Sequence, residues 1–154
     1  MYPYAGTGLT ACIPPWAHEG GHPALVERLK DPETRARIKQ EIQTPSNEWE
    51  NMFLQNGPES IMLCGFRQEA LKPLTGKTLA QVAAERGTPP EDTMMDLLVE
   101  DDSRIFTMYF CMSDDNLRKQ MGLPWVSFCS DAESQTPEGV FLKVNPHPRA
   151  YGSF

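Results

Sequence analysis

The sequence lacks any apolar run long enough to cross a lipid bilayer. Its apolar stretches, such as residues 61–64, fall far short of the roughly 20 residues that a membrane-spanning helix needs. Its first residues also lack the basic and apolar regions of a secretory signal. We therefore expect no transmembrane helix and a cytoplasmic location.

Positive charge is scarce as well. The chain has 14 lysines and arginines against 21 aspartates and glutamates, which gives a formal net charge of -7. Proteins that bind nucleic acid or anionic membranes neutralise phosphate groups with basic residues. The charge balance therefore predicts neither a nucleic acid nor a membrane as a partner. The 154 residues, 40% of them hydrophobic, are enough for one soluble globular core.

The four cysteines lack the close C-x-x-C spacing of zinc knuckles and redox motifs. They stand at positions 12, 64, 111 and 129, each among apolar neighbours. That setting favours small, buried hydrophobic side chains, and disulfides are disfavoured in a cytosolic protein.

Helix start and stop signals are frequent in the middle of the chain. Each expected helix begins at a proline or at a side chain that can cap it, and two of the helices end at Gly87 and Gly122. The helices expected on these signals span residues 24–29, 31–43, 78–87, 88–100 and 114–121.

Short apolar runs at residues 60–65, 105–111 and 125–129 predict strands, because they are β-branched or aromatic and bounded by loop residues. The last two flank the helix expected at 114–121, which predicts a β-α-β unit in a parallel sheet covered on both faces. The fold class expected is therefore α/β. Proline- and glycine-rich stretches at residues 3–23 and 134–153 predict long loops of the kind that line binding sites.

The segment H-E-G-G-H at residues 18–22 matches the zinc-binding motif H-E-x-x-H letter by letter. That motif works because a helix places both histidines on one face. Here two central glycines, with prolines at positions 14, 15 and 23, oppose a helix. We therefore interpret residues 18–22 as a loop with two exposed histidines.

Asp131 directly follows the strand expected at residues 125–129. In parallel α/β sheets and barrels, residues just past the C-terminal ends of strands line the active site. A carboxylate at that position can take a proton from an attacking water and return it to the leaving group. An aspartate that caps the following turn explains the sequence equally well.

Arg149 belongs to the cationic and aromatic segment H-P-R-A-Y-G at residues 147–152. The planar guanidinium group of arginine binds carboxylates through two parallel hydrogen bonds. A substrate carboxylate is therefore one partner for Arg149, and a surface ion pair is the alternative.

Nine short segments of the chain resemble, in the same order, segments of the D-aminoacylase family. They are Y-P-Y at 2–4, G-T-G-L at 6–9, P-P-W-A at 14–17, L-K-D-P at 29–32, G-K-T-L-A at 76–80 with A-E-R-G at 84–87, M-S-D at 112–114, P-W-V at 124–126, S-D at 130–131 and H-P-R-A-Y-G at 147–152. Together they cover essentially the whole chain.

The resemblance implies a partial (β/α)8 barrel of the TIM type, in which residues 1–154 are the C-terminal segment of one amidohydrolase catalytic domain and residues 9–60 form a helical lid insertion. The activity it implies is the zinc-dependent hydrolysis of N-acyl-D-amino acids to a carboxylate and a D-amino acid. Asp131 would activate the zinc-bound water. Tyr4 would face the substrate, and Thr7, where the family has a serine, would help to hold the substrate carboxylate.

The zinc ligands of the family are histidine and cysteine residues on earlier strands of the barrel. The resemblance therefore implies that this chain holds no metal ligand, that the N-terminal half of the barrel supplies the zinc site, and that the isolated segment is inactive. Two alternatives stand beside it. One is a related cyclic-amide hydrolase, of the hydantoinase or dihydroorotase type. The other is a non-catalytic binding segment.

Overall fold

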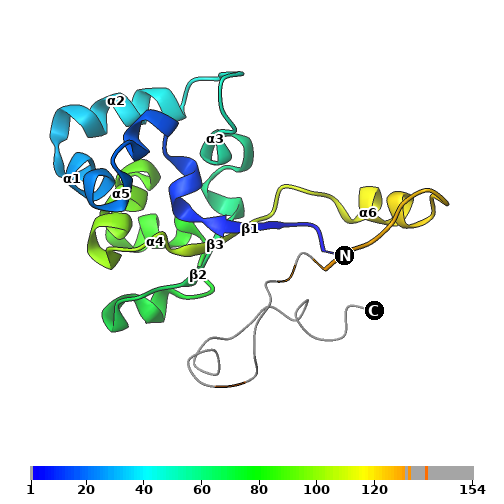
Figure 1. The fold of residues 1–154 in the computed structure, drawn as a ribbon. Coiled ribbons are helices and arrows are strands. Elements are labelled where there is room, and N and C mark those ends of the chain that lie inside the picture. The colour runs from blue at the N-terminus through cyan, green and yellow to red at the C-terminus, as the bar shows by residue number, and fades with distance from the viewer. Residues whose placement is uncertain (1, 131, 133–137, 139–154) are drawn as a thin grey trace. The chain divides into compact units, whose positions relative to one another are not determined.

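The computed structural model describes residues 2–130, 132 and 138. The chain divides into two compact units, Met1–Leu117 and Arg118–Phe154. The first unit contains a small sheet and a layer of helices (Figure 1). Within the described part of the second unit, the regular secondary structure is the end of one helix.

The sheet of the first unit has three strands, β1 (Ala5–Gly8), β2 (Ile61–Gly65) and β3 (Phe106–Tyr109), in the order β1-β3-β2. Both pairings are antiparallel. Ala5 of β1 and Ile61 of β2 both lie opposite Tyr109, one on each side of β3. The start of the chain is thereby paired with a strand that follows about a hundred residues later (Figure 1).

This sheet confirms a mixed α/β class and corrects the expected topology. The strands expected at residues 60–65 and 105–111 are confirmed, but residues 125–129 form no strand. Trp125 in that run is 75% exposed, and among the described residues no strand pairs with the run to complete its backbone hydrogen bonds. The predicted parallel β-α-β unit is therefore wrong, and the described residues do not show a partial barrel.

Most helices lie where their start and stop signals predict them, but the helix expected at residues 24–29 begins earlier, at Gly21, and the helix Met52–Asn56 was not predicted. The helices are α1 (Gly21–Lys30), α2 (Pro32–Ile42), α3 (Met52–Asn56), α4 (Leu79–Arg86), α5 (Pro90–Asp101) and α6 (Asp114–Met121). The Asp31 side chain caps α2 by accepting from Thr34 N at 2.8 Å. Thr78 and Gln81 form both bonds of the expected capping box. No helix in the described part of the chain is both long and apolar enough to span a membrane.

Residues 3–23, expected as one long loop, contain several ordered elements. These are β1, the 3-10 helices η1 (Leu9–Cys12) and η2 (Pro15–His18), and the first turn of α1. The loop prediction for this stretch is wrong. Leu9, Cys12 and Ala17 are fully buried, and their burial stabilises the ordered elements although the proline- and glycine-rich sequence has a low propensity for helix or strand. The second expected loop, at residues 134–153, lies outside the described residues except for Glu138.

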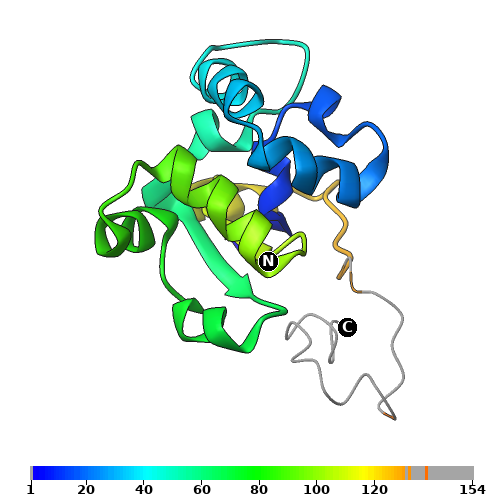
Figure 2. The same cartoon turned by 90° about the vertical axis from the view of Figure 1, so that its left-hand side faces the viewer.

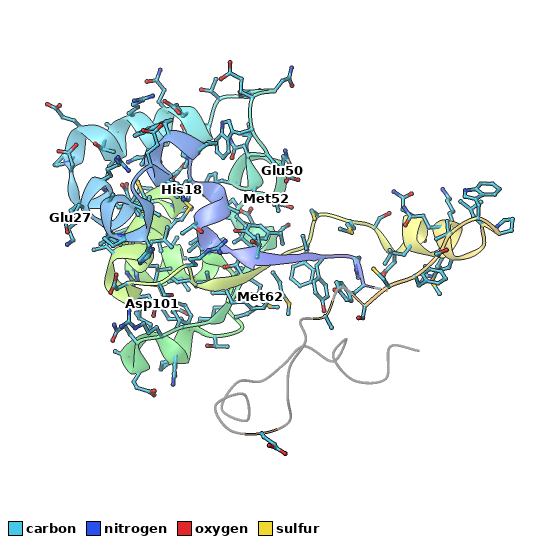
Figure 3. The ribbon with its side chains drawn as sticks, viewed as in Figure 1. His18, Glu27, Glu50, Met52, Met62 and Asp101 are labelled. Atoms are coloured by element: carbon cyan, nitrogen blue, oxygen red, sulfur yellow. The ribbon has the colours of Figure 1, made fainter. Side chains whose placement is uncertain are left out.

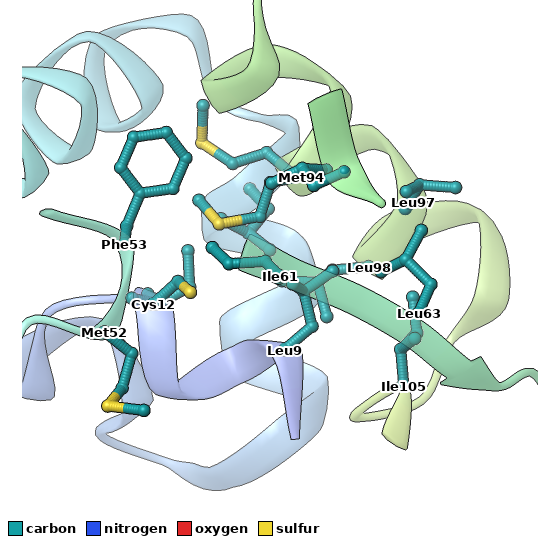
Figure 4. Packing of buried hydrophobic residues seen from close by; sticks show 14 of the residues in the cluster. Leu9, Cys12, Met52, Phe53, Ile61, Leu63, Met94, Leu97, Leu98 and Ile105 are labelled. Carbon is teal, nitrogen blue, oxygen red and sulfur yellow. The ribbon is translucent and has the colours of Figure 1, made fainter. Parts of the chain in front are cut away.

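One hydrophobic core joins the helices to the inner face of the sheet (Figure 4). Helix α5 packs against α1, α2 and α4, and so lies at the centre of the helical layer (Figure 2). Short 3-10 helices, η3 (Pro58–Ser60) and η4 (Glu69–Leu74), flank β2. Residues 9–60 share this core with the strands: Leu29, Ile38 and Ile42 are as fully buried as Ile61 and Leu63. That these residues act as a lid stays a prediction.

The outer face of the sheet is apolar and open. Phe106 is 47% exposed, and Met62 and Met108, opposite each other in register, are half-buried. Gly6 and Gly65 make room for the Phe106 side chain, since a Cβ atom at either glycine would lie 3.2 Å from it. Apolar patches of this kind on a soluble protein commonly mark a contact surface.

The carboxylate of Asp101, at the end of α5, ties the turn after β2 to the helical layer (Figure 3). It is 0% exposed and accepts hydrogen bonds from the backbone N–H groups of Arg67 at 3.0 Å and Gln68 at 2.9 Å, and from the hydroxyl of Ser103. Hydrogen bonds to a buried charged group are stronger than those between neutral groups. Removal of the carboxylate would also leave its buried donors without an acceptor.

We expect the Asp101→Ala variant to lose about 3 kcal/mol of unfolding free energy, measured by urea denaturation, because three donors lose their acceptor together. Asp96→Ala is the matched control on the same helix. Asp96 forms a partly exposed ion pair with Arg35 at 2.8 Å, and its loss is expected to cost under about 1 kcal/mol. Equal losses for the two variants would contradict the role of Asp101.

Candidate functional site

A pocket of about 750 Å³ lies beside β1 in the first unit. Its walls come from β1, η1, the start of α1, the segment before α3, and Arg104. Much of the lining is apolar, with Ile13, Leu25, Trp49 and Met52 among the contributing side chains. Figure 3 shows the positions of His18, Glu50 and Met52 relative to this part of the fold.

Both histidines of the 18–22 segment line this pocket, but on different elements. His18 ends η2, and its Nε2 lies 3.3 Å from the carbonyl oxygen of Ile13. His22 stands in the first turn of α1, and its Nε2 lies 3.2 Å from Oδ1 of Asp102. Gly20 separates the two helices with a φ of 86°. The two histidines therefore do not share one helical face, as expected, but the interpretation of two exposed histidines in a loop is wrong, because both are half-buried and stand in helices.

The described residues contain no group of three or more histidine, cysteine, aspartate or glutamate side chains placed to hold a metal ion. They therefore offer no ligand set that fits zinc. The resemblance to D-aminoacylases implies that the zinc ligands are residues upstream of this chain.

Two opposite charges line the pocket without forming an ion pair. Arg104 lies beside the end of β1, where its carbonyl oxygen accepts a hydrogen bond from Leu9 N at 2.8 Å. Glu50 lies on the segment before α3. Both side chains are exposed, and within the described residues neither has a hydrogen-bond or ion-pair partner. Each is thus available to a molecule that enters the pocket.

Thr7, one of the two predicted substrate-binding residues that the structure describes, lines this pocket. Tyr4, the other, lies elsewhere: its ring stacks on Tyr2 with centroids 4.4 Å apart and meets the edge of Phe110 at 5.7 Å. The structure therefore gives Thr7 and Tyr4 different surroundings. Asp131 and Arg149 lie outside the described residues.

A second pocket, of about 800 Å³, lies next to Trp16 and α2. There the indole Nε1 of Trp16 donates to Glu41 at 2.7 Å, and the guanidinium of Arg37 lies 3.8 Å from the centre of the Trp16 ring. Arg37 Nε also donates to Glu41 at 2.8 Å. These polar groups bind one another, so the arrangement serves to hold η2 against α2.

Sequence reasoning missed Glu50, Arg104 and Thr10 as pocket residues. No motif marks them, and Arg104 reaches the pocket only because β3 pairs with β1. The sequence does contain a signal for the part of the pocket near the two histidines. The glycine pair at residues 20–21, before Pro23, predicts an irregular chain path there.

Comparisons of this chain with protein-family models, with curated proteins and with solved structures found no match. The function of this chain is therefore inferred from its sequence segments and from the geometry of the described residues.

Proposed function

We propose that this chain supplies the C-terminal part of the catalytic domain of a zinc-dependent N-acyl-D-amino-acid deacylase. The observation that carries the proposal is the ordered series of nine segments, from Y-P-Y at residues 2–4 to H-P-R-A-Y-G at 147–152, that resemble the D-aminoacylase family. The fold that this proposal implies is a partial (β/α)8 barrel with a helical lid insertion.

Two features of the first unit support its attachment to the rest of a larger domain. The strands β1 and β3 pair side by side, and beyond them Met112 N donates to the carbonyl oxygen of Pro3 at 3.2 Å. The chain therefore enters and leaves the unit at neighbouring positions. The exposed side chains of Phe106, Phe110 and Met112 also offer an apolar surface to the rest of a larger domain.

In the proposed reaction, this chain's own residues move the proton and hold the substrate. The Asp131 carboxylate takes a proton from the attacking water and delivers it to the amine nitrogen that leaves when the amide bond breaks. The guanidinium of Arg149 and the hydroxyl of Thr7 donate hydrogen bonds to the substrate carboxylate, and Tyr4 faces the substrate. Zinc would be held by residues upstream of this chain.

The test joins this chain to the upstream half of the barrel and measures D-leucine release from N-acetyl-D-leucine. We expect release by the joined protein in the presence of zinc and none by the 154-residue chain alone. N-acetyl-L-leucine is the matched control substrate. Hydrolysis of dihydroorotate or a hydantoin in its place would identify the related cyclic-amide hydrolase, and inactivity on every one of these substrates would overturn the proposal.

A further inference from the structure

The pocket beside β1 combines features that suit a ligand with charges of both signs. At one place it is lined by Gly21 and His22 in the first turn of α1. The N-cap residue, Gly20, has no side chain to cap the helix, and the first turn contains no acidic residue. The free N–H groups of Gly21 and His22 and the positive end of the helix dipole favour a carboxylate here. The carboxylate of Asp102, which lies 3.2 Å from His22 Nε2, is itself paired with Arg67 at 3.2 Å.

Two further groups in the pocket can donate to the same carboxylate. Arg104 carries a positive charge with no partner among the described residues. Thr10 is only 4% exposed, and within the described part of the chain its hydroxyl has no hydrogen-bond partner. The hydroxyl oxygen itself is accessible to solvent, so it can donate to a ligand in the pocket.

Glu50 gives the pocket a second, negative charge. It would repel a simple carboxylate, but it attracts an ammonium group, and the aromatic side chain of Trp49 lines the same pocket. The apolar side chains of Ile13, Leu25 and Met52 complete the pocket and suit an apolar side chain. One type of small molecule satisfies all of these groups together.

We propose that this pocket binds a zwitterion with an apolar side chain, of which a free amino acid is the smallest example and a short peptide a longer one. The ligand carboxylate lies at Arg104 and the first turn of α1, and its ammonium group lies at Glu50. This inference goes beyond the proposed function: the pocket shares Thr7 with the proposed substrate site, but the binding described here needs neither zinc nor Asp131.

Isothermal titration calorimetry of the 154-residue chain at pH 7 tests the proposal with leucine, leucinamide and N-acetylleucine. Leucinamide lacks the carboxylate, and N-acetylleucine lacks the ammonium group. We expect leucine to bind about tenfold more tightly than either derivative, since each loses one charge-assisted contact. Equal affinity for the three compounds, or no binding of leucine at millimolar concentration, would overturn the proposal.

Two variants assign the charges. Arg104→Gln should bind leucine and leucinamide equally while keeping its preference over N-acetylleucine, and Glu50→Gln should show the reverse pattern. Arg86→Gln and Glu59→Gln are matched controls outside the pocket, and both should keep the discrimination of the parent chain. A loss of both preferences in either control would contradict the assignment.

The same titration with leucyl-leucine separates the two sources of such a zwitterion. Tighter binding of the dipeptide would assign the pocket to peptides, and tighter binding of leucine would assign it to amino acids. D- and L-leucine, measured in parallel, give the stereochemical preference.

Discussion

An Asp131→Asn variant of the complete enzyme should hydrolyse N-acetyl-D-leucine about 10²–10⁴-fold more slowly than its parent, because the proton carrier is gone. Asparagine has nearly the shape of aspartate but cannot accept a proton from the attacking water or return it to the leaving amine. The zinc content of the variant, measured by atomic absorption, should stay close to that of the parent enzyme, since the proposed zinc ligands lie upstream of this chain.

Asp114→Asn is the control for this variant. Asp114 also carries a negative charge near Asp131 in the sequence, but it stands in the first turn of α6, where its expected contribution is to helix stability alone. The control should retain the parental turnover. Retained activity in Asp131→Asn would remove Asp131 from the mechanism. Parallel loss of zinc and activity would instead make Asp131 a metal ligand.

The second large effect is expected in alkaline solution and centres on Cys12. Its thiol Sγ lies 3.5 Å from the hydroxyl of Tyr109, and both side chains are fully buried. The Tyr109 hydroxyl donates its hydrogen to the carbonyl oxygen of Gly8 at 2.9 Å. While Tyr109 donates to Gly8, the thiol of Cys12 can donate to the Tyr109 oxygen; when Cys12 is ionised, the Tyr109 hydroxyl can donate to the thiolate instead.

Burial raises the pKa of the Cys12 thiol from 9.0 to about 12, a shift that its hydrogen bond with Tyr109 only partly opposes. The pKa of Tyr109 is also raised, chiefly by burial and further by Cys12. Below pH 9 the thiol is protonated in the folded and the unfolded chain, and the pH has no effect through this group. Between pH 9 and about 12 the unfolded chain releases the proton while the folded chain keeps it.

The free energy of unfolding should therefore fall as the pH rises through this window, by about 1.4 kcal/mol per pH unit for the Cys12 thiol. Urea denaturation at a series of pH values measures the slope. The Cys12→Ala variant should lose this contribution and show a shallower slope. Cys111→Ala, in which an exposed cysteine is removed, should keep the parental slope. Identical slopes in all three proteins would contradict the assignment.

The helices could be predicted because their signals are local. Asp31 caps α2 through a bond to Thr34, three residues later, and Thr78 and Gln81 cap α4 over the same distance. Such contacts form within one turn of the chain, so the order of residue types is sufficient to locate them. The boundaries of α2, α4 and α6 followed directly from these residues.

Strand pairing could not be predicted in the same way. The strand β1 has the sequence A-G-T-G, which has little intrinsic preference for a strand. It is a strand because β3, about a hundred residues later, completes its hydrogen bonds. The pocket depends on the same long-range pairing, since it brings Arg104 beside Gly8 and Leu9, so that Arg104 and Thr7 line the same pocket. The roles of Asp131 and Arg149 still depend on sequence resemblance alone.

The pairing of Ala5 with Tyr109 has a consequence for how such a chain changes during evolution or engineering. A host domain needs only a two-residue turn to join two adjacent antiparallel strands. A single in-frame insertion at that turn can therefore add the whole stretch between these residues, and a single deletion can remove it, without displacing the strands on either side. We therefore expect the stretch from Ala5 to Tyr109 to be transferable as one unit, joined to its host at the flanking residues Pro3 and Met112.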